Sequence, residues 1–205
     1  MAKKRRRVAN PLALAVLAWL VMEPMHPYEL GRRLQETGQD KQIKYNRSSL
    51  YMVVDQLTRA GFIAAQQTVR DTQRPERTVY ALTDDGRSEL YAWMRELVAE
   101  PQHEYPQFGV ALSLLSVLAP LEAADLLTRR RSSLDAEIAG IRAGMAESTA
   151  GGLAWVFQIE DDYRLILLAA ESQFVAGLIT ALRDPDYIEQ WQKSMGQNSS
   201  GGRES

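Results

Sequence analysis

Residues Asn46–Gly61, with the sequence NRSSLYMVVDQLTRAG, contain the pattern that decides the fold. Asparagine is favoured as a helix N-cap, and glycine is favoured just after a helix ends. Between them, apolar residues recur at the i, i+3, i+4, i+7 spacing of a helix with one buried face: Leu50, Val53, Val54 and Leu57. The stretch therefore predicts a helix over residues 47–60 whose other face carries arginine, hydroxyl and tyrosine side chains.

Two shorter helices are predicted on the N-terminal side of this stretch. Pro11 suits the first turn of a helix, and Pro24 ends that helix because proline cannot continue it. Pro27 begins a second helix, which Gly38 closes. The three helices together have the order of a helix-turn-helix motif.

On the C-terminal side, the apolar period changes from 3.6 residues to two. Residues 62–69 and 77–82 are each predicted as a β-strand, with a polar turn at residues 70–76. Thr83 then caps a fourth helix. Three short helices followed by a β-hairpin is the winged helix-turn-helix order, in which the third helix enters the major groove of DNA. We expect the hairpin to lie across neighbouring phosphates.

The second half of the chain is predicted to be almost entirely helical. Residues 100–106, with two prolines, mark the boundary, and two long amphipathic helices are joined at Gly151-Gly152. Such a helical hairpin cannot bury both of its faces alone, so a second copy of the chain is the simplest partner. Packing of the hairpin on the winged domain is the alternative. The predicted dimer contacts are Leu127, Leu134, Ile138, Val156, Tyr163, Leu167 and Phe174.

The predicted architecture is mainly α-helical and has four parts. A flexible basic arm at residues 1–9 precedes a winged-helix domain at residues 10–99, and a helical dimerisation domain at residues 106–184 precedes a tail at residues 185–205, whose end we expect to be disordered.

Composition excludes several classes of function. The 205 residues include no cysteine and two histidines, which excludes disulfides, thiol catalysis and thiolate zinc sites and makes histidine-based metal binding an unfavourable hypothesis. The sequence has no phosphate loop, no G-x-S-x-G, no dinucleotide fingerprint and no H-E-x-x-H. We therefore expect no enzymatic activity, no metal and no cofactor.

The distribution of charge indicates a polyanionic partner. Residues 1–80 carry 14 Lys and Arg against 7 Asp and Glu, whereas residues 81–205 carry 10 against 19. Five of the cations lie at residues 3–7, ahead of an apolar run, an order that mimics a signal peptide. No small-residue cleavage site follows this run, so we expect a cytoplasmic protein.

Three motifs support a more specific assignment. They are His26-Pro27-Tyr28-Glu29-Leu30, then Ser48-Ser49-Leu50-Tyr51 followed by Gly61-Phe62-Ile63, and then Arg77-Thr78-Val79-Tyr80-Ala81-Leu82-Thr83-Asp84-Asp85-Gly86. In this order they resemble the second helix, the third helix with its exit, and the wing of PadR-type transcriptional regulators. Residues 108–182 resemble the longer C-terminal dimerisation domain of that family. Pro27 and Met52 stand where the family often has glycine and proline.

The resemblance implies a dimeric repressor that binds an inverted-repeat operator in double-stranded DNA. In many members of the family, a small-molecule effector releases the DNA. Alternative functions are a winged-helix module that binds another protein, and a small-molecule sensor without direct operator binding. Trp93 and Trp155 mark a candidate effector pocket, for which core or interface packing is the alternative.

The candidate DNA contacts share long cationic, hydroxyl-bearing or exposed apolar side chains. Arginine, serine and tyrosine side chains reach phosphates or base edges, and an arginine can pair with guanine. A solvated helix face is the alternative interpretation. The predicted contacts are Tyr28, Lys44, Tyr45, Arg47, Ser48, Ser49, Tyr51, Met52, Arg70, Arg74 and Arg77.

Overall fold

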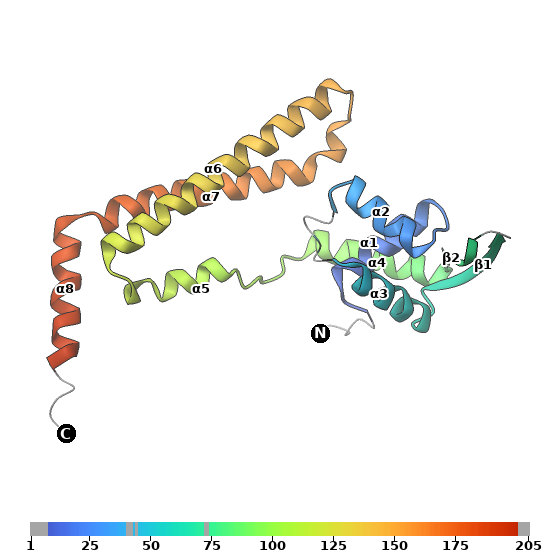
Figure 1. Ribbon diagram of the computed structural model, residues 1–205, viewed down its shortest axis with the longest axis horizontal. Coiled ribbons are helices and arrows are strands. Elements are labelled where there is room, and N and C mark those ends of the chain that lie inside the picture. The colour runs from blue at the N-terminus through green and yellow to red at the C-terminus, as the bar shows by residue number, and fades with distance from the viewer. Residues whose placement is uncertain (1–7, 40–42, 44, 72–73, 201–205) are drawn as a thin grey trace. The chain divides into compact units, whose positions relative to one another are not determined.

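The computed structural model describes residues 8–39, 43, 45–71 and 74–200 (Figure 1). The chain divides into two compact units, Met1–His103 and Glu104–Ser205. Residues 101–106, which span the junction, adopt no helix or strand. Each unit has its own hydrophobic core, and each is described here by itself.

The N-terminal unit has the element order of a winged helix. In chain order it contains α1 (Pro11–Met22), α2 (Pro27–Glu36), α3 (Arg47–Arg59), β1 (Ile63–Asp71), β2 (Arg74–Leu82) and α4 (Asp84–Ala99). Its core gathers the apolar faces of all four helices, and the predicted stripe Leu50, Val53, Val54 and Leu57 is fully buried in it. The opposite face of α3 is thereby left exposed.

Side-chain caps determine where α2 and α3 begin. Nδ1 of His26 accepts a hydrogen bond from the backbone N–H of Tyr28 at 3.1 Å. At α3, Oδ1 of Asn46 accepts from the N–H of Ser49 at 2.8 Å, and the Ser49 hydroxyl accepts from the N–H of Asn46 at 2.9 Å. This reciprocal capping box satisfies two backbone donors that a helix start otherwise leaves unpaired.

A close backbone approach joins α4 to the end of α3. A Cβ at Gly86 would lie 1.9 Å from the carbonyl oxygen of Phe62, so only glycine fits at this position. The same carbonyl accepts the backbone N–H of Thr83 at 3.0 Å. Glycine at position 86 therefore allows the first turn of α4 to pack directly on the chain that leaves α3.

The wing is longer than the sequence predicts. β1 and β2 pair antiparallel from Ile63 opposite Leu82 to Asp71 opposite Arg74, with register shifts after Ala65 and Val69. Residues 72 and 73 lie outside the described residues. The predicted turn at residues 70–76 is polar at nearly every position, so it contains no alternation from which its strand conformation could be recognised.

The C-terminal unit is a long helical hairpin with short flanking helices. It contains α5 (Gln107–Ser113), the 3-10 helix η2 (Leu115–Val117), α6 (Pro120–Ala150), the 3-10 helix η3 (Trp155–Phe157), α7 (Ile159–Leu182) and α8 (Pro185–Ser200). α6 and α7 run side by side along most of their length (Figure 1). Charged pairs connect them: Arg130 with Glu171, Glu137 with Arg164, and Asp125 with Arg183.

α8 differs from the expected tail. The chain is helical as far as Ser200, and the indole N–H of Trp191 donates to the backbone oxygen of Ser116 at 3.2 Å. Tyr187, Ile188 and Trp191 form a short apolar stripe at helical spacing, followed by a polar sequence rich in Ser and Gly. That polar composition concealed the helix, and residues 201–205 lie outside the described residues.

The predicted dimer contacts separate into two groups. Leu127, Leu134 and Ile138 are only 4–7% exposed, because the single chain already buries them inside its own hairpin. The other four, on η3 and α7, are 51–62% exposed: Val156, Tyr163, Leu167 and Phe174. A repeat at heptad-like spacing does not reveal whether the partner helix belongs to the same chain or to a second copy. For the first group, the partner helix belongs to the same chain.

α7 is also long and apolar enough, by length and composition, to cross a membrane. Within the hairpin, however, Arg164 and Glu171 of α7 form ion pairs with α6. Exposed apolar side chains of η3 and α7 form a stripe that begins at Val156 of η3 and continues along α7 through Tyr163 and Leu167 to Phe174.

Candidate nucleic-acid interface

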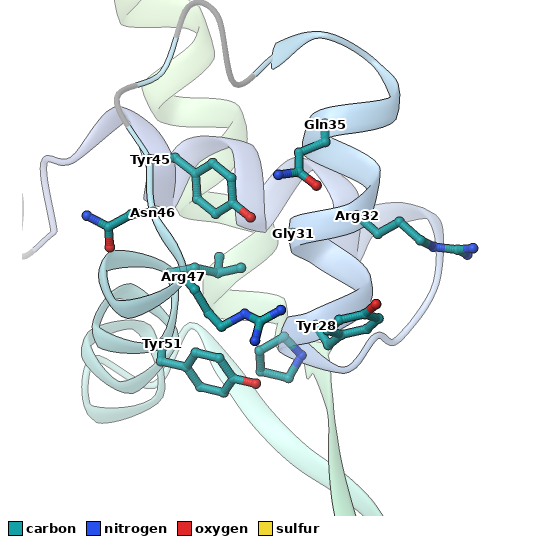
Figure 2. Close-up of a pocket in the computed structure, with 10 residues that line it drawn as sticks. Tyr28, Gly31, Arg32, Gln35, Tyr45, Asn46, Arg47 and Tyr51 are labelled. Carbon is teal, nitrogen blue, oxygen red and sulfur yellow. The ribbon is translucent and has the colours of Figure 1, made fainter.

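A cleft of about 300 Å³ opens between α2 and the start of α3 (Figure 2). Donor-bearing side chains dominate its wall, and none of the lining residues is acidic. α2 contributes four residues beyond Pro27, and the start of α3 with the two residues before it contributes the rest. The lining residues are Pro27, Tyr28, Gly31, Arg32, Gln35, Tyr45, Asn46, Arg47, Leu50 and Tyr51.

The exposed face of α3 continues outward from this cleft. Tyr51 is 45% and Met52 53% exposed, and Arg47 and Ser48 are exposed in the first turn. Backbone N–H groups at a helix start and the positive end of the helix dipole favour an anion at this position. Ser49 differs from its neighbours, because its hydroxyl is used in the capping box and donates to the Asn46 carbonyl at 2.8 Å.

Arg47 is held by an aromatic ring rather than by a carboxylate. Its guanidinium carbon lies 5.7 Å from the centroid of the Tyr28 ring on α2, within the range of a cation–π contact. In the described part of the chain, Arg47 has no ion-pair partner. Figure 2 shows its guanidinium directed across the cleft toward Tyr28.

Arg32, on the opposite wall, is neutralised within its own helix. It forms ion pairs with Glu29 and Glu36. The hydrogen bond that Arg32 donates to Glu29, together with the charges of both carboxylates, raises the pKa of Arg32. The uncompensated positive charge of the cleft therefore comes from Arg47.

Three tyrosines contribute their hydroxyls to the cleft. Among residues 8–39, 43, 45–71 and 74–200, no hydrogen-bond partner is found for the hydroxyls of Tyr28, Tyr45 and Tyr51. Figure 2 shows the Tyr45 hydroxyl directed into the cleft toward α2, and the Tyr51 hydroxyl directed across its mouth. Together with Arg47, the structure thus brings four of the predicted contacts to one cleft: Tyr28, Tyr45, Arg47 and Tyr51.

Other predicted contacts lie beyond what the structure describes. Lys44 and the basic residues 3–7 lie outside the described residues. The backbones of Arg70, Arg74 and Arg77 lie in β1 and β2, but their side chains are outside the described part.

Trp93 and Trp155, the candidate effector residues, lie in different units. Trp93 is 6% exposed and belongs to the core of the N-terminal unit. Trp155 is 67% exposed on η3, where its indole N–H donates to Asp162 at 2.8 Å. The structure does not assign these two residues to one site. Within the part of the chain that the structure describes, no three His, Asp or Glu side chains are grouped to hold a metal ion.

Sequence analysis missed the α2 wall of the cleft. Gly31, Arg32 and Gln35 line it together with Tyr28. Their spacing places them on one side of the predicted second helix, which Pro27 begins, next to its buried leucines. That spacing was a usable signal, because a helix-turn-helix places the second helix beside the start of the third.

Comparison with known proteins agrees with this geometry. Residues 16–92, which include the cleft and the exposed face of α3, match the transcriptional regulator PadR-like family. The negative transcriptional regulator PadR of Bacillus subtilis (strain 168) is 27% identical over 182 residues, covering 85% of this chain and 98% of that protein. Residues 16–92 are therefore similar to the PadR-like domain of transcriptional regulators. The family is a class of regulators and not of enzymes.

Solved structures extend the likeness of fold to both units. Bacillus subtilis PadR in complex with operator DNA matches with a TM-score of 0.65 at 19% identity, over 84% of this chain and 99% of that one. The same protein in complex with p-coumaric acid matches with a TM-score of 0.68 at 20% identity, over 84% and 99%. The Vibrio cholerae virulence activator AphA matches with a TM-score of 0.65 at 16% identity, over 83% and 97%.

Proposed function

We propose that this PadR-like regulator is a dimeric, cytoplasmic repressor that binds operator DNA with α3 in the major groove. One observation carries the proposal: Arg47 and three tyrosine hydroxyls gather at the cleft between α2 and α3, and in the described part of the chain Arg47 has no ion-pair partner and the hydroxyls have no hydrogen-bond partner. Unsatisfied donors and an unpaired cation suit a ligand made of acceptors and negative charge, which describes duplex DNA. The operator complex of Bacillus subtilis PadR supports the same assignment.

The proposed contacts divide by the part of the DNA that they reach. Arg47, Ser48, Tyr51 and Met52, on the exposed face of α3, approach base edges and adjoining phosphates. Backbone phosphates are the proposed partners of Tyr28, Lys44, Tyr45 and the wing arginines Arg70, Arg74 and Arg77. Ser49 is more important as a helix cap than as a DNA contact, because its hydroxyl is already engaged.

Dimerisation is assigned to the apolar stripe on η3 and α7. Exposed large apolar side chains in such a continuous arrangement mark an interaction surface, and a second copy completes it with two-fold symmetry. The stripe comprises Val156, Tyr163, Leu167 and Phe174. Two recognition helices related in this way read half-sites about 34 Å apart, one helical turn of DNA.

A small-molecule effector is proposed to release the DNA. Bacillus subtilis PadR binds p-coumaric acid, a small aromatic carboxylic acid, and this chain shares its fold across both units. Tryptophan fluorescence tests this part, since Trp155 is exposed to solvent and its emission responds to its surroundings. Titration with p-coumaric acid is expected to change the emission and to weaken a preformed DNA complex. If the tryptophan emission and the DNA complex are both unchanged by p-coumaric acid, this acid is not the effector.

A gel shift on the promoter of the protein's own operon tests the central proposal. Wild type is expected to shift the operator duplex at concentrations that leave an unrelated duplex free. Arg47→Ala is expected to weaken operator binding by about 1–3 kcal/mol. Arg95→Ala on α4, whose guanidinium also lies over a tyrosine ring, is the matched control and should bind as wild type does. Equal affinities of both variants would reject α3 as the DNA-contacting helix.

A further inference from the structure

Gly31 lies where the two walls of the cleft meet. It is buried in the middle of α2, a position at which glycine is unfavourable compared with alanine. A Cβ at Gly31 would lie 2.8 Å from the hydroxyl oxygen of Tyr45 and 3.3 Å from Cδ2 of Leu50. The missing methyl group therefore leaves the space that the Tyr45 hydroxyl occupies.

In the described part of the chain, the Tyr45 hydroxyl reaches this position without an acceptor. Its ring is half-buried, and the described residues provide no hydrogen-bond partner for the hydroxyl. The hydroxyl oxygen is not one of the buried polar atoms without a partner, so it is open to the cleft, where a ligand can reach it. A ligand atom in the cleft that accepts a hydrogen bond from the Tyr45 hydroxyl would explain why the hydroxyl is directed there.

The remaining groups of the cleft specify the charge of that ligand. Arg47 supplies a cation held by Tyr28, and Arg32 is neutralised by its own glutamates. With no carboxylate in the lining, the cleft suits an oxyanion and not a cation. A phosphate oxygen can accept from a hydroxyl and a guanidinium at the same time.

We propose that this cleft is a subsite for one backbone phosphate of the operator, bound by Tyr45 and Arg47. Gly31 is the positioning residue, because it leaves room for the Tyr45 hydroxyl. The inference rests on the proposed DNA binding and adds a fixed phosphate contact outside the major groove. Such a contact sets the register of α3 on the duplex and carries no base information itself.

A double-mutant cycle tests the role of Gly31. Tyr45→Phe removes one hydrogen bond and is expected to weaken operator binding about fivefold. Gly31→Ala collides with the Tyr45 hydroxyl and displaces the whole tyrosine side chain, so it is expected to weaken binding by about tenfold or more. The double variant should bind as Tyr45→Phe does, because a phenylalanine ring leaves space for the alanine methyl group.

The alternative to positioning gives a different result. If Gly31 matters only for helix stability, the double variant loses affinity by the product of the two single effects, and the inference is overturned. Gly31→Ala binding that equals wild type also overturns it. Should Gly31→Ala fail to fold, comparison of the double variant with Tyr45→Phe still decides, with thermal unfolding of each as the control.

Neutral methylphosphonate links, placed one at a time along the operator, locate the phosphate. At one backbone position in each half-site, the neutral link is expected to cost wild type more affinity than it costs Tyr45→Phe, in which only Arg47 still contacts the phosphate. An identical positional profile for both proteins rejects the subsite while leaving DNA binding intact. Failure of wild type to bind any duplex instead rejects the proposed function, so the two failures are distinguishable.

Discussion

The guanidinium of Arg47, the first residue of α3, rests on the ring of Tyr28, the second residue of α2, at 5.7 Å from its centroid. The contact connects the two helices of the helix-turn-helix across the mouth of the cleft (Figure 2). It restricts a long side chain in advance, so binding need not order that side chain.

Tyr28 variants separate stacking from hydrogen bonding. Tyr28→Ala removes the ring and is expected to weaken operator binding about two- to fivefold, as for an exposed cation–π contact. Tyr28→Phe keeps the ring and removes only the hydroxyl that is proposed to contact a phosphate, so it should lose less affinity than Tyr28→Ala does. Equilibrium titration of labelled operator measures both. Equal losses in the two variants would assign the effect to the hydroxyl and refute the stacking role.

Loss of the capping box should destabilise α3. Asn46→Ala removes the acceptor for the Ser49 N–H and is expected to reduce the unfolding free energy by about 0.5–2 kcal/mol. Asn46→Asp retains an acceptor oxygen and should stay close to wild type. Denaturant unfolding followed by circular dichroism compares the two variants, and a stability of Asn46→Ala equal to wild type would argue against the cap.

Glycine-to-alanine substitutions should have opposite effects at two positions. A methyl group at Gly86 meets the Phe62 carbonyl at 1.9 Å, so Gly86→Ala is expected to lower the melting temperature strongly. At Gly140, in the middle of α6, a methyl group meets nothing within 4 Å, and Ala should raise stability by about 0.5–1 kcal/mol. Thermal unfolding measures both. A stable Gly86→Ala would show that this close approach can relax.

A charge on the α7 stripe should separate the dimer. Leu167→Glu places a carboxylate on the apolar stripe. The mass measured by light scattering is expected to fall from near 46 kDa, twice the chain mass of 23.1 kDa, to the mass of one chain. Gln173→Glu adds the same charge on another side of α7 and is the matched control. A dimeric Leu167→Glu protein would exclude the stripe as the interface.

The N-terminal fold could be predicted closely because local signals agree there. Asn46, Gly61 and the apolar stripe between them predict a helix at residues 47–60, and α3 covers Arg47–Arg59. The wing was predicted too short, since the polar residues near Asp71 and Arg74 lack alternation.

Tertiary relationships were less accessible from sequence. The apolar spacing of α6 predicted an interface, but Leu127, Leu134 and Ile138 pack within their own hairpin. The cleft depends on Gly31 and Tyr45, which are 14 positions apart in the chain and meet only after α2 and α3 pack. Arg47 could be identified as a candidate contact from its place on the helix, whereas its Tyr28 partner required the structure.

The apolar stripe on α7 also has a consequence for the life of the protein in the cell. A newly made chain that has not met a second copy exposes Tyr163, Leu167 and Phe174 to water. Surfaces of this kind are recognised by chaperones and proteases, and mass action determines how long a lone chain persists. At low concentration a larger share of the chains is monomeric and is degraded faster. Degradation of the monomer therefore sets a minimum expression level below which the dimer does not accumulate.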